Sequence, residues 1–302
     1  MVPAVGGRAF VVREFSLSET RAGEKFLKLV LSDREGMLDA RVWDPVRAEE
    51  LARVLRPGMV VVCSGRLGSY SGQAQLVVEE MRPALDGEYD PLLLRPPGPD
   101  VSASVRRFRE LWGSVSAPHL AEFLRHVFRP DVVSLFERAT AAKGNHHAYE
   151  GGLVEHTVEV AELCEAACRF CPDLDRDLLI CAALVHDVGK LQEYDNDSPT
   201  FERTDVGKLV CHLVLGRDVV REAVARLPGF PERDALHLEH LVLSHHGQLE
   251  WGSPVEPRTL EAVVLCHADL LSARLGAARM AVRGQDPGWT PEGPGRRSFW
   301  VP

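Results

Sequence analysis

Long hydrophobic runs are missing from this chain of 302 residues. No uninterrupted apolar stretch approaches the roughly 20 residues that cross a bilayer, so we expect no membrane partner. The first residues also lack a positively charged segment followed by an apolar core and a cleavage site, so export is not expected. These two absences predict a cytoplasmic protein.

The number of cysteines is small for a disulfide-rich protein, and it is odd. Seven cysteines lie scattered through apolar stretches, which predicts reduced thiols and excludes a disulfide-stabilised scaffold. Cys168 and Cys171 have the C-x-x-C spacing, but no second pair completes a zinc site. Together with Cys164 they fall at helical spacing, so we interpret them as one packing stripe.

Positive charge is also in short supply. The chain has 35 Lys and Arg against 44 Asp and Glu, a net charge of −9, which argues against indiscriminate binding of nucleic acid. The deficit is uneven: residues 1–82 hold 12 basic and 11 acidic residues, and the remainder holds 23 and 33. An anionic polymer is therefore expected on the first segment, whereas the acidic remainder is compatible with cation binding.

The first segment predicts a small all-β domain. Five β-rich runs are separated by Gly, Asp and Ser signals, and a hairpin turn is expected at residues 33–36. A short helix is predicted at residues 45–55, between the third and fourth runs. Five strands with a helix in this place are typical of an OB-fold barrel.

Aromatic and basic side chains of the barrel are candidates for nucleic-acid binding. Stacked bases and neutralised phosphates are the usual contacts of single strands on such folds. In so small a barrel, interior packing is the competing interpretation for each aromatic residue. The candidates are Arg13, Phe26, Lys28, Arg41, Trp43, Arg66 and Tyr70.

A proline-rich linker and a helical domain follow. Five prolines in residues 83–100 exclude a continuous helix there. Amphipathic helices are predicted at residues 102–112, 118–128 and 131–140, and they begin a helical bundle. The expected domains are thus 1–82, the linker 83–100, and 101–302, with an irregular tail after residue 282.

His186 and Asp187 stand together at the end of the apolar run LLICAALVHDVGK. Leu179, Ala182, Ala183 and His186 fall at helical spacing, so the imidazole should project from a buried face. A buried charge needs a partner, and a metal ion is one candidate.

Other polar residues lie on or beside the apolar stripes of further predicted helices. Each one alone is compatible with a hydrogen-bonded core residue. As a set, nitrogen and carboxylate ligands that converge from five helices predict a shared centre for divalent metals. The additional candidates are His156, His212, His245, His246 and Asp269.

The order H…HD…H…HH…D resembles the HD-domain superfamily of metal-dependent phosphohydrolases. The stretches KGNHHAYEGGLVEHT, DRDLLICAALVHDVGK and HLVLSHHGQLEWGSP and the terminal RRSFW are similar to the YhaM-type 3′-5′ exoribonucleases. That resemblance implies an OB-fold module followed by an all-α HD domain, and it covers nearly the whole chain.

The resemblance also implies roles for the candidate ligands. It places His156, His186, Asp187 and Asp269 around one ion, with Asp187 bridging to a second ion. His212 and either His245 or His246 would hold that second ion. Ligands without thiolate suit manganese, iron or cobalt as readily as zinc.

Three residues near the candidate ligands in the sequence are candidates for contacts with the substrate. Lys190 lies one turn beyond His186 and could meet the scissile phosphate, although a solvated lysine at a helix C-terminus fits equally well. His147 precedes the first ligand-bearing helix, and the resemblance implies a role near the substrate. Trp251 could stack on a terminal base or be buried under its loop.

Taken together, the sequence predicts a metal-dependent 3′-5′ exonuclease that acts on single-stranded RNA, with DNA as a further substrate left open. Two ions per chain are expected, and a homo-oligomer is left open. One alternative is an HD phosphohydrolase of free nucleotides or cyclic dinucleotides. The other is a nucleic-acid-binding protein whose metal site is not catalytic.

Overall fold

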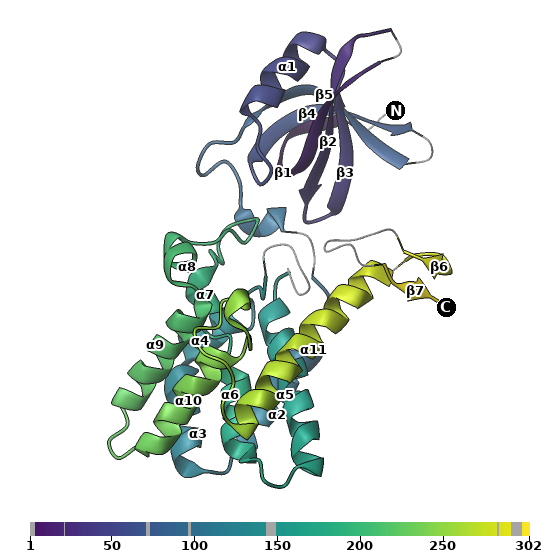
Figure 1. Cartoon of the computed structure of the whole chain (residues 1–302). Coiled ribbons are helices and arrows are strands. Elements are labelled where there is room, and N and C mark those ends of the chain that lie inside the picture. Colours follow the sequence, from purple (N-terminus) through teal and green to yellow (C-terminus); the bar gives the residue numbers. More distant parts are fainter. Residues whose placement is uncertain are drawn as a thin grey trace. The chain divides into compact units, whose positions relative to one another are not determined.

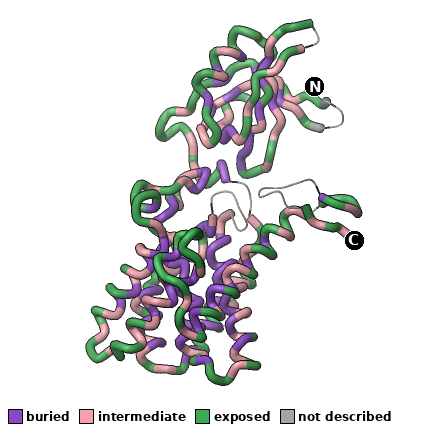
Figure 2. The backbone as a smooth tube through the Cα atoms, viewed as in Figure 1, coloured by how far each residue is buried: buried purple, intermediate pink, exposed green. Residues whose placement is uncertain are grey.

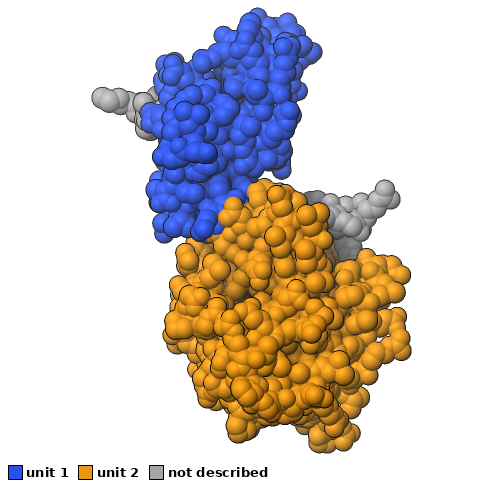
Figure 3. Space-filling model, turned by 90° about the vertical axis from the view of Figure 1, so that its left-hand side faces the viewer, with its two compact units in different colours: residues 1–97, 197–200 blue, residues 98–196, 201–302 orange. Residues whose placement is uncertain are grey.

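A computed structural model gives the fold for residues 4–20, 22–70, 73–95, 98–142, 149–282, 284–290 and 298–302. The chain divides into two compact units, coloured separately in Figure 3: residues 1–97 with 197–200, and residues 98–196 with 201–302. No helix among the described residues is long and apolar enough to cross a membrane.

The first unit is a closed five-stranded barrel with the strand order β1-β2-β3-β5-β4 (Figure 1). All neighbouring strands are antiparallel except β3 and β5, which pair in parallel. This is the predicted OB-fold topology. Its strands are β1 (Ala4–Glu19), β2 (Lys25–Asp33), β3 (Gly36–Val42), β4 (Val60–Tyr70) and β5 (Gln73–Pro83).

Local signals fix two connections of the barrel. The predicted hairpin joins β2 to β3, with Asp33 paired to Gly36, and the Asp33 carboxylate accepts the Glu35 N–H at 2.8 Å. Helix α1 (Pro45–Val54) begins where Asp44 accepts the N–H groups of Val46 and Arg47, each at 3.0 Å. Its buried face packs on the barrel core.

The second unit is a helical bundle built around one central helix. In α6 (Arg176–Val185) every residue from Leu178 to Val185 is buried, as expected for a helix that is apolar on all sides (Figure 2). The other helices of the bundle core are α2 (Ser102–Gly113), α3 (Pro118–Val127), α4 (Pro130–Phe136), α5 (Gly152–Phe170), α9 (His212–Ala225), α10 (Glu232–Ser244) and α11 (Leu260–Val282).

Short elements complete the chain. The described part of the linker contains a 3₁₀ turn, two short helices precede α9, and a second 3₁₀ turn follows α10. These elements are η1 (Pro91–Leu94), α7 (Lys190–Glu193), α8 (Asp205–Val210) and η2 (Leu249–Trp251).

Two boundaries differ from expectation. The helix predicted to reach residue 140 ends at Phe136, because the backbone N–H groups of Gly151 and Leu153 bind the carbonyls of Arg138 and Ala139 instead. The tail is not wholly irregular in its described part: β6 (Gly288–Trp289) pairs with β7 (Trp300–Val301). The Trp289 and Trp300 rings meet there at 5.7 Å.

A glycine in β4 provides a test of the barrel. An added Cβ at Gly65 would lie 2.1 Å from the Val77 carbonyl oxygen, next to a register shift between β4 and β5. We expect Gly65→Ala to destabilise the barrel by about 1–3 kcal/mol, because the backbone must move. Hydrogen exchange of barrel peptides measures this loss. The control is Gly68→Ala on the same strand, where the nearest atom is 3.8 Å away. Equal protection in the two variants would contradict the expectation.

Candidate metal centre

Seven polar side chains that are far apart in the sequence meet inside the helical unit. His186 and Asp187 directly follow α6, and His245 and His246 directly follow α10. His212 is the first residue of α9. The remaining two, His156 and Asp269, lie within α5 and α11. The predicted convergence of five helices is therefore found, although several of these residues lie at helix ends and not on stripes.

The two imidazoles that follow α6 and α10 are held in the same way. His186 Nδ1 lies 2.8 Å from the Ala183 carbonyl, and His245 Nδ1 lies 2.7 Å from the Val242 carbonyl. The last carbonyls of a helix lack a partner within the helix, so an N–H of the ring at its end can satisfy one of them. Each Nε2 consequently points away from its helix.

A first cluster forms around His156. Its Nε2 lies 3.0 Å from Asp269 Oδ1, 3.4 Å from Asp187 Oδ2 and 3.4 Å from His186 Nε2. All four side chains are buried or nearly so, with Asp269 the most accessible at 16% exposed.

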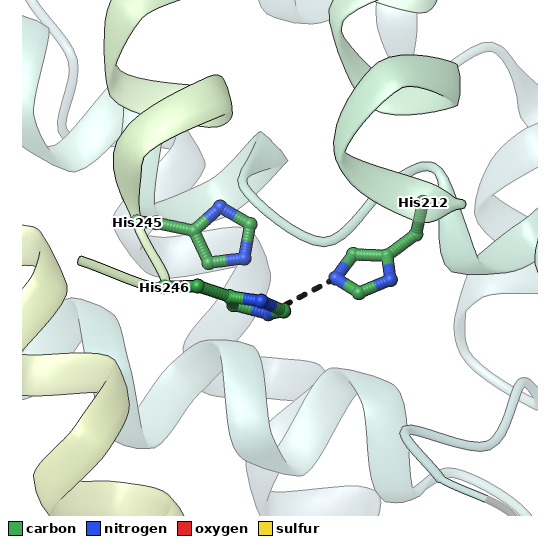
Figure 4. Close-up of side chains that lie close together, drawn as sticks. All are labelled: His212, His245 and His246. Carbon is green, nitrogen blue, oxygen red and sulfur yellow. Dashed lines mark hydrogen bonds between the residues drawn. The ribbon is translucent and has the colours of Figure 1, made fainter. Parts of the chain in front are cut away.

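A second cluster consists of His212, His245 and His246 (Figure 4). His212 Nε2 faces His246 Nε2 at 3.2 Å, the contact drawn as a dashed line. His245 lies beside both, with ring centroids 5.8 Å from His212 and 4.6 Å from His246.

Asp187 lies between the two clusters. Its Oδ2 faces the first, whereas Oδ1 lies 3.5 Å from His212 Nε2 and 3.6 Å from His245 Nε2. Within the part of the chain that the structure describes, Asp187 Oδ1 and His245 Nε2 are buried without a hydrogen-bond partner. Such atoms are costly unless a ligand satisfies them.

The protons of the other imidazoles can be placed from their partners. His246 Nδ1 lies 3.0 Å from the Trp251 carbonyl, and His212 Nδ1 donates to the Glu193 carboxylate. Ser272 donates its hydroxyl to Glu159 at 2.7 Å, so its oxygen must accept from His156 Nδ1 at 3.0 Å. In neutral imidazoles held like this, every Nε2 carries a lone pair.

The geometry therefore fits divalent cations. As neutral rings in these tautomers, two pairs of Nε2 atoms, 3.4 Å and 3.2 Å apart, would face each other with lone pairs, an arrangement that a shared cation satisfies. Ligands at about 2.1 Å from a shared tetrahedral ion are themselves roughly 3.4 Å apart. His156, His186 and Asp187 could hold one ion, and His212, His245 and His246 another.

The electrostatics favours the ligand forms of most of these groups. Burial lowers the pKa of His156, His212 and His245, and it lowers the pKa of His246 to about 4. Neutral imidazole is the form that binds metal. For His186, burial would lower the pKa, but the charge of Asp187 outweighs it and the pKa is raised.

Both aspartates are held ionised. Burial would raise their pKa values, yet both are lowered: Lys190 and His186 act on Asp187, and His156 acts on Asp269. Lys190 lies beside Asp187, with Nζ 2.5 Å from Asp187 Oδ2. The alternative of a solvated lysine is wrong, since its side chain is only 14% exposed.

Gly189 allows the ligand-bearing segments to approach each other. An added Cβ at Gly189 would lie 2.1 Å from the His212 carbonyl oxygen and 2.5 Å from the Gly216 nitrogen. A side chain here would push α9, and with it His212, away from Asp187.

The barrel places four nucleic-acid candidates on one outer face. Lys28 pairs with Arg41 across β2 and β3, and alternation puts Phe26 and Trp43 on the same side. The Phe26 and Trp43 rings stack at 4.7 Å, and Lys28 Nζ lies 5.6 Å from the Phe26 centroid. Interior packing is thus wrong for Trp43, which is 47% exposed, whereas Phe26 is only 8% exposed and is a buried residue.

The remaining candidates are less uniform. Arg13 donates to Ser32 at 2.6 Å, and Arg66 forms an ion pair with Glu79 at 2.6 Å, so both are engaged within the barrel. Trp251 is 44% exposed, so burial under its loop is wrong. Tyr70 ends β4, but its side chain lies outside the described residues, as does His147.

Sequence reasoning missed the residues that hold the ligands. Glu193, Glu159 and Ser272 fix His212 and His156, and each lies outside the sequence stretches that mark the candidate ligands. Burial would raise the pKa of Glu193, but the hydrogen bond from His212 and the charge of Arg203 lower it. Only the meeting of distant segments reveals these contacts.

Comparisons with known proteins agree with this architecture. Residues 5–84 match the OB-fold nucleic acid binding domain family, and residues 153–274 match the HD domain family. Among solved structures, the mitochondrial single-stranded DNA binding protein Rim1 of S. cerevisiae is similar, with a TM-score of 0.25 and 16% identity. That match covers 29% of this chain and 98% of Rim1. The fold and the site thus define an HD-domain protein with an OB-fold module.

Whole-chain relatives narrow the class to one family. The 3′-5′ exoribonuclease YhaM of a Geobacillus species is 31% identical over 88% of this chain and 81% of its own length. YhaM of Halalkalibacterium halodurans is 30% identical over 97% of this chain and 92% of its own. The chain belongs to the YhaM family of 3′-5′ exoribonucleases, as the sequence motifs predicted.

The shared carboxylate is the first residue to test. Asp187→Asn removes the charge that faces both clusters, so we expect phosphodiesterase activity to fall at least about 100-fold, with reduced bound metal and unchanged helical content. The control is Asp205→Asn, on α8, whose carboxylate is 93% exposed. Full turnover by the Asp187 variant, with its metal content unchanged, would refute the assignment.

The number of ions gives a second test. We expect two divalent ions per active chain, because two clusters flank Asp187. His212→Ala should lose one ion and keep the other, and His156→Ala should show the reverse preference. Elemental analysis of the dialysed proteins measures both. One tightly bound ion in a fully active wild-type chain would show that the centre is mononuclear.

Proposed function

We propose that this protein is a metal-dependent 3′-5′ exonuclease of single-stranded RNA that releases mononucleotides. The observation that carries the proposal is the buried Asp187 carboxylate, which presents one oxygen to each of two imidazole clusters. Membership of the YhaM family supports the substrate and the direction.

The ligands proposed for the first ion are His156, His186, Asp187 and Asp269. Those for the second are Asp187, His212, His245 and His246. Divalent ions held by these atoms would lower the pKa of a bound water and neutralise charge on the scissile phosphate. Oxygen and nitrogen donors without thiolate suit manganese, iron or cobalt, and also zinc.

Side chains around the centre would act on the substrate directly. Lys190, a buried cation 2.5 Å from Asp187 Oδ2, can donate to a non-bridging phosphate oxygen. The Trp251 carbonyl holds His246, which places this residue next to the second cluster. Because Trp251 is also exposed, its indole can stack on the terminal base. His147 remains a candidate for proton transfer.

The barrel would hold the rest of the strand. Its outer face over β2 and β3 combines the exposed Trp43, stacked on the buried Phe26, with the cations Lys28 and Arg41, of which Arg41 lies 3.6 Å from Asp39. Stacking surfaces beside positive charges are how OB-folds bind single strands without sequence preference. DNA shares the bases and phosphates, so we expect it to bind as well.

The decisive experiment uses RNA labelled at its 5′ end, with Mn²⁺ or with a chelator. Degradation from the 3′ end gives a ladder of shortening labelled products, and the chelator should abolish it. Labelled mononucleotide as the first product would show degradation from the 5′ end instead. An intact strand alongside hydrolysed free nucleotides would favour a nucleotide phosphohydrolase, and an intact strand without hydrolysis a binding protein. The same assay on DNA decides its use as substrate.

The barrel face yields a separate prediction. Trp43→Ala should weaken binding of long single-stranded RNA by about 1–3 kcal/mol, roughly 5- to 150-fold, because one stacked base is lost. Hydrolysis of a small activated phosphodiester should be unchanged, since no candidate ligand lies in the barrel. Fluorescence anisotropy and a chromogenic assay give the two readouts. Phe170→Ala, an 80% exposed aromatic at the end of α5, is the control. Equal RNA affinity of both variants would remove Trp43 from the binding surface.

A further inference from the structure

Glu193, the last residue of α7, is a buried carboxylate aimed at the second cluster. Its side chain is fully buried, and Oε2 accepts two N–H groups of His212: the backbone N–H at 2.9 Å and the ring Nδ1–H. One carboxylate thus fixes both the position of His212 and the orientation of its ring.

The other oxygen of Glu193 meets a cation. Arg203 Nε lies 2.9 Å from Oε1, and its guanidinium lies over the Tyr194 ring, 6.0 Å from the centroid. A backbone bridge between Tyr194 and Arg203 holds this arginine in place. The Arg203 contact is an ion pair without hydrogen-bond geometry, so His212 supplies the hydrogen bonds of this buried anion and Arg203 supplies the opposite charge.

The segment that contains α8 packs closely against Glu193. An added Cβ at Gly207 would lie 2.3 Å from the Glu193 carbonyl oxygen and 2.8 Å from its Cγ, so α8 can pack here only with glycine. The Thr204 N–H binds the same carbonyl at 2.9 Å. Cys211, with φ 66°, then separates α8 from α9 and leaves the His212 N–H free for Glu193.

His212 differs from its neighbours in this respect. Backbone carbonyls hold His186, His245 and His246, and a serine hydroxyl holds His156. Unlike these neutral oxygens, the Glu193 carboxylate places a negative charge beside the ring. That charge raises the basicity of Nε2 and strengthens it as a metal ligand.

We propose that Glu193 is a positioning residue that makes the second ion site, with Arg203 holding the carboxylate in place. The inference rests on the proposed function for the identity of the site. In this role, Glu193 fixes the tautomer of His212 and strengthens its Nε2 as a metal ligand. Loss of the carboxylate should therefore weaken the second ion and leave the ion near His156 bound.

Glu193→Gln is the sharpest substitution because it keeps the size of the side chain. Its amide oxygen can accept both N–H groups only if its NH₂ faces the Arg203 guanidinium, which sets donor against donor. The opposite orientation turns the NH₂ towards Nδ1 and moves the ring proton to Nε2. A protonated Nε2 cannot bind metal. Glu193→Asp retains the charge and should recover part of the affinity.

The experiment titrates the metal-free full chain with Mn²⁺ and follows ions bound per chain. We expect Glu193→Gln to bind the second ion about 10- to 100-fold more weakly, with the first unchanged. Long-range ¹H–¹⁵N spectra should show the His212 ring proton shifting from Nδ1 to Nε2. The control is Glu165→Gln, which removes a comparable Glu–Arg pair, 2.8 Å from Arg176, away from both clusters.

Each outcome decides between the alternatives. If Glu193 had only a structural role, Glu193→Gln and Glu193→Asp would both lower thermal stability, but the His212 ring proton and the ratio of the two ion affinities would stay unchanged. That result would overturn the proposal. If Glu193→Gln does not fold, Arg203→Gln, at a 52% exposed side chain, takes its place. It should weaken the second ion several-fold, and unchanged titration would refute the role. Wild-type protein that binds two ions but leaves RNA intact would reject the proposed function and not this inference.

Discussion

A single buried carboxylate, that of Asp187, is the constraint on which the centre depends. Its two oxygens face different imidazole clusters, and Lys190 supplies the nearest positive charge within the protein. Removing two negative oxygens from water is costly unless cations or donors surround them. The helices of the second unit are therefore arranged around this group: α6 delivers it, and α5, α9, α10 and α11 bring polar atoms to it.

The histidines around Asp187 illustrate how orientation is enforced. In all five, Nδ1 is committed to a carbonyl, a hydroxyl or a carboxylate, so Nε2 is left for the centre. Three of these contacts use backbone carbonyls, which cannot be lost by substitution. His156 and His212 depend on side chains instead, and so their geometry is open to change by Ser272 or Glu193.

In the proposed function, binding and chemistry are divided between the two units. Cations and stacked rings lie on the outer face of the barrel, whereas the acidic helical unit carries the candidate ligands. An acidic surface repels a polyanion at long range, and a separate module with balanced charge can supply the affinity that the catalytic unit lacks.

The sequence by itself determined the two folds and the candidate ligands. Alternation and turn residues marked the barrel, and the apolar run before His186 marked the central helix, because these signals act over a few neighbouring residues. Tertiary structure alone decided three things: the position of Asp187 between two clusters, the stacking of the exposed Trp43 on the buried Phe26, and the holding of His212 by Glu193. Each depends on segments that meet only after folding, and neither spacing nor composition records which distant donor will reach which acceptor.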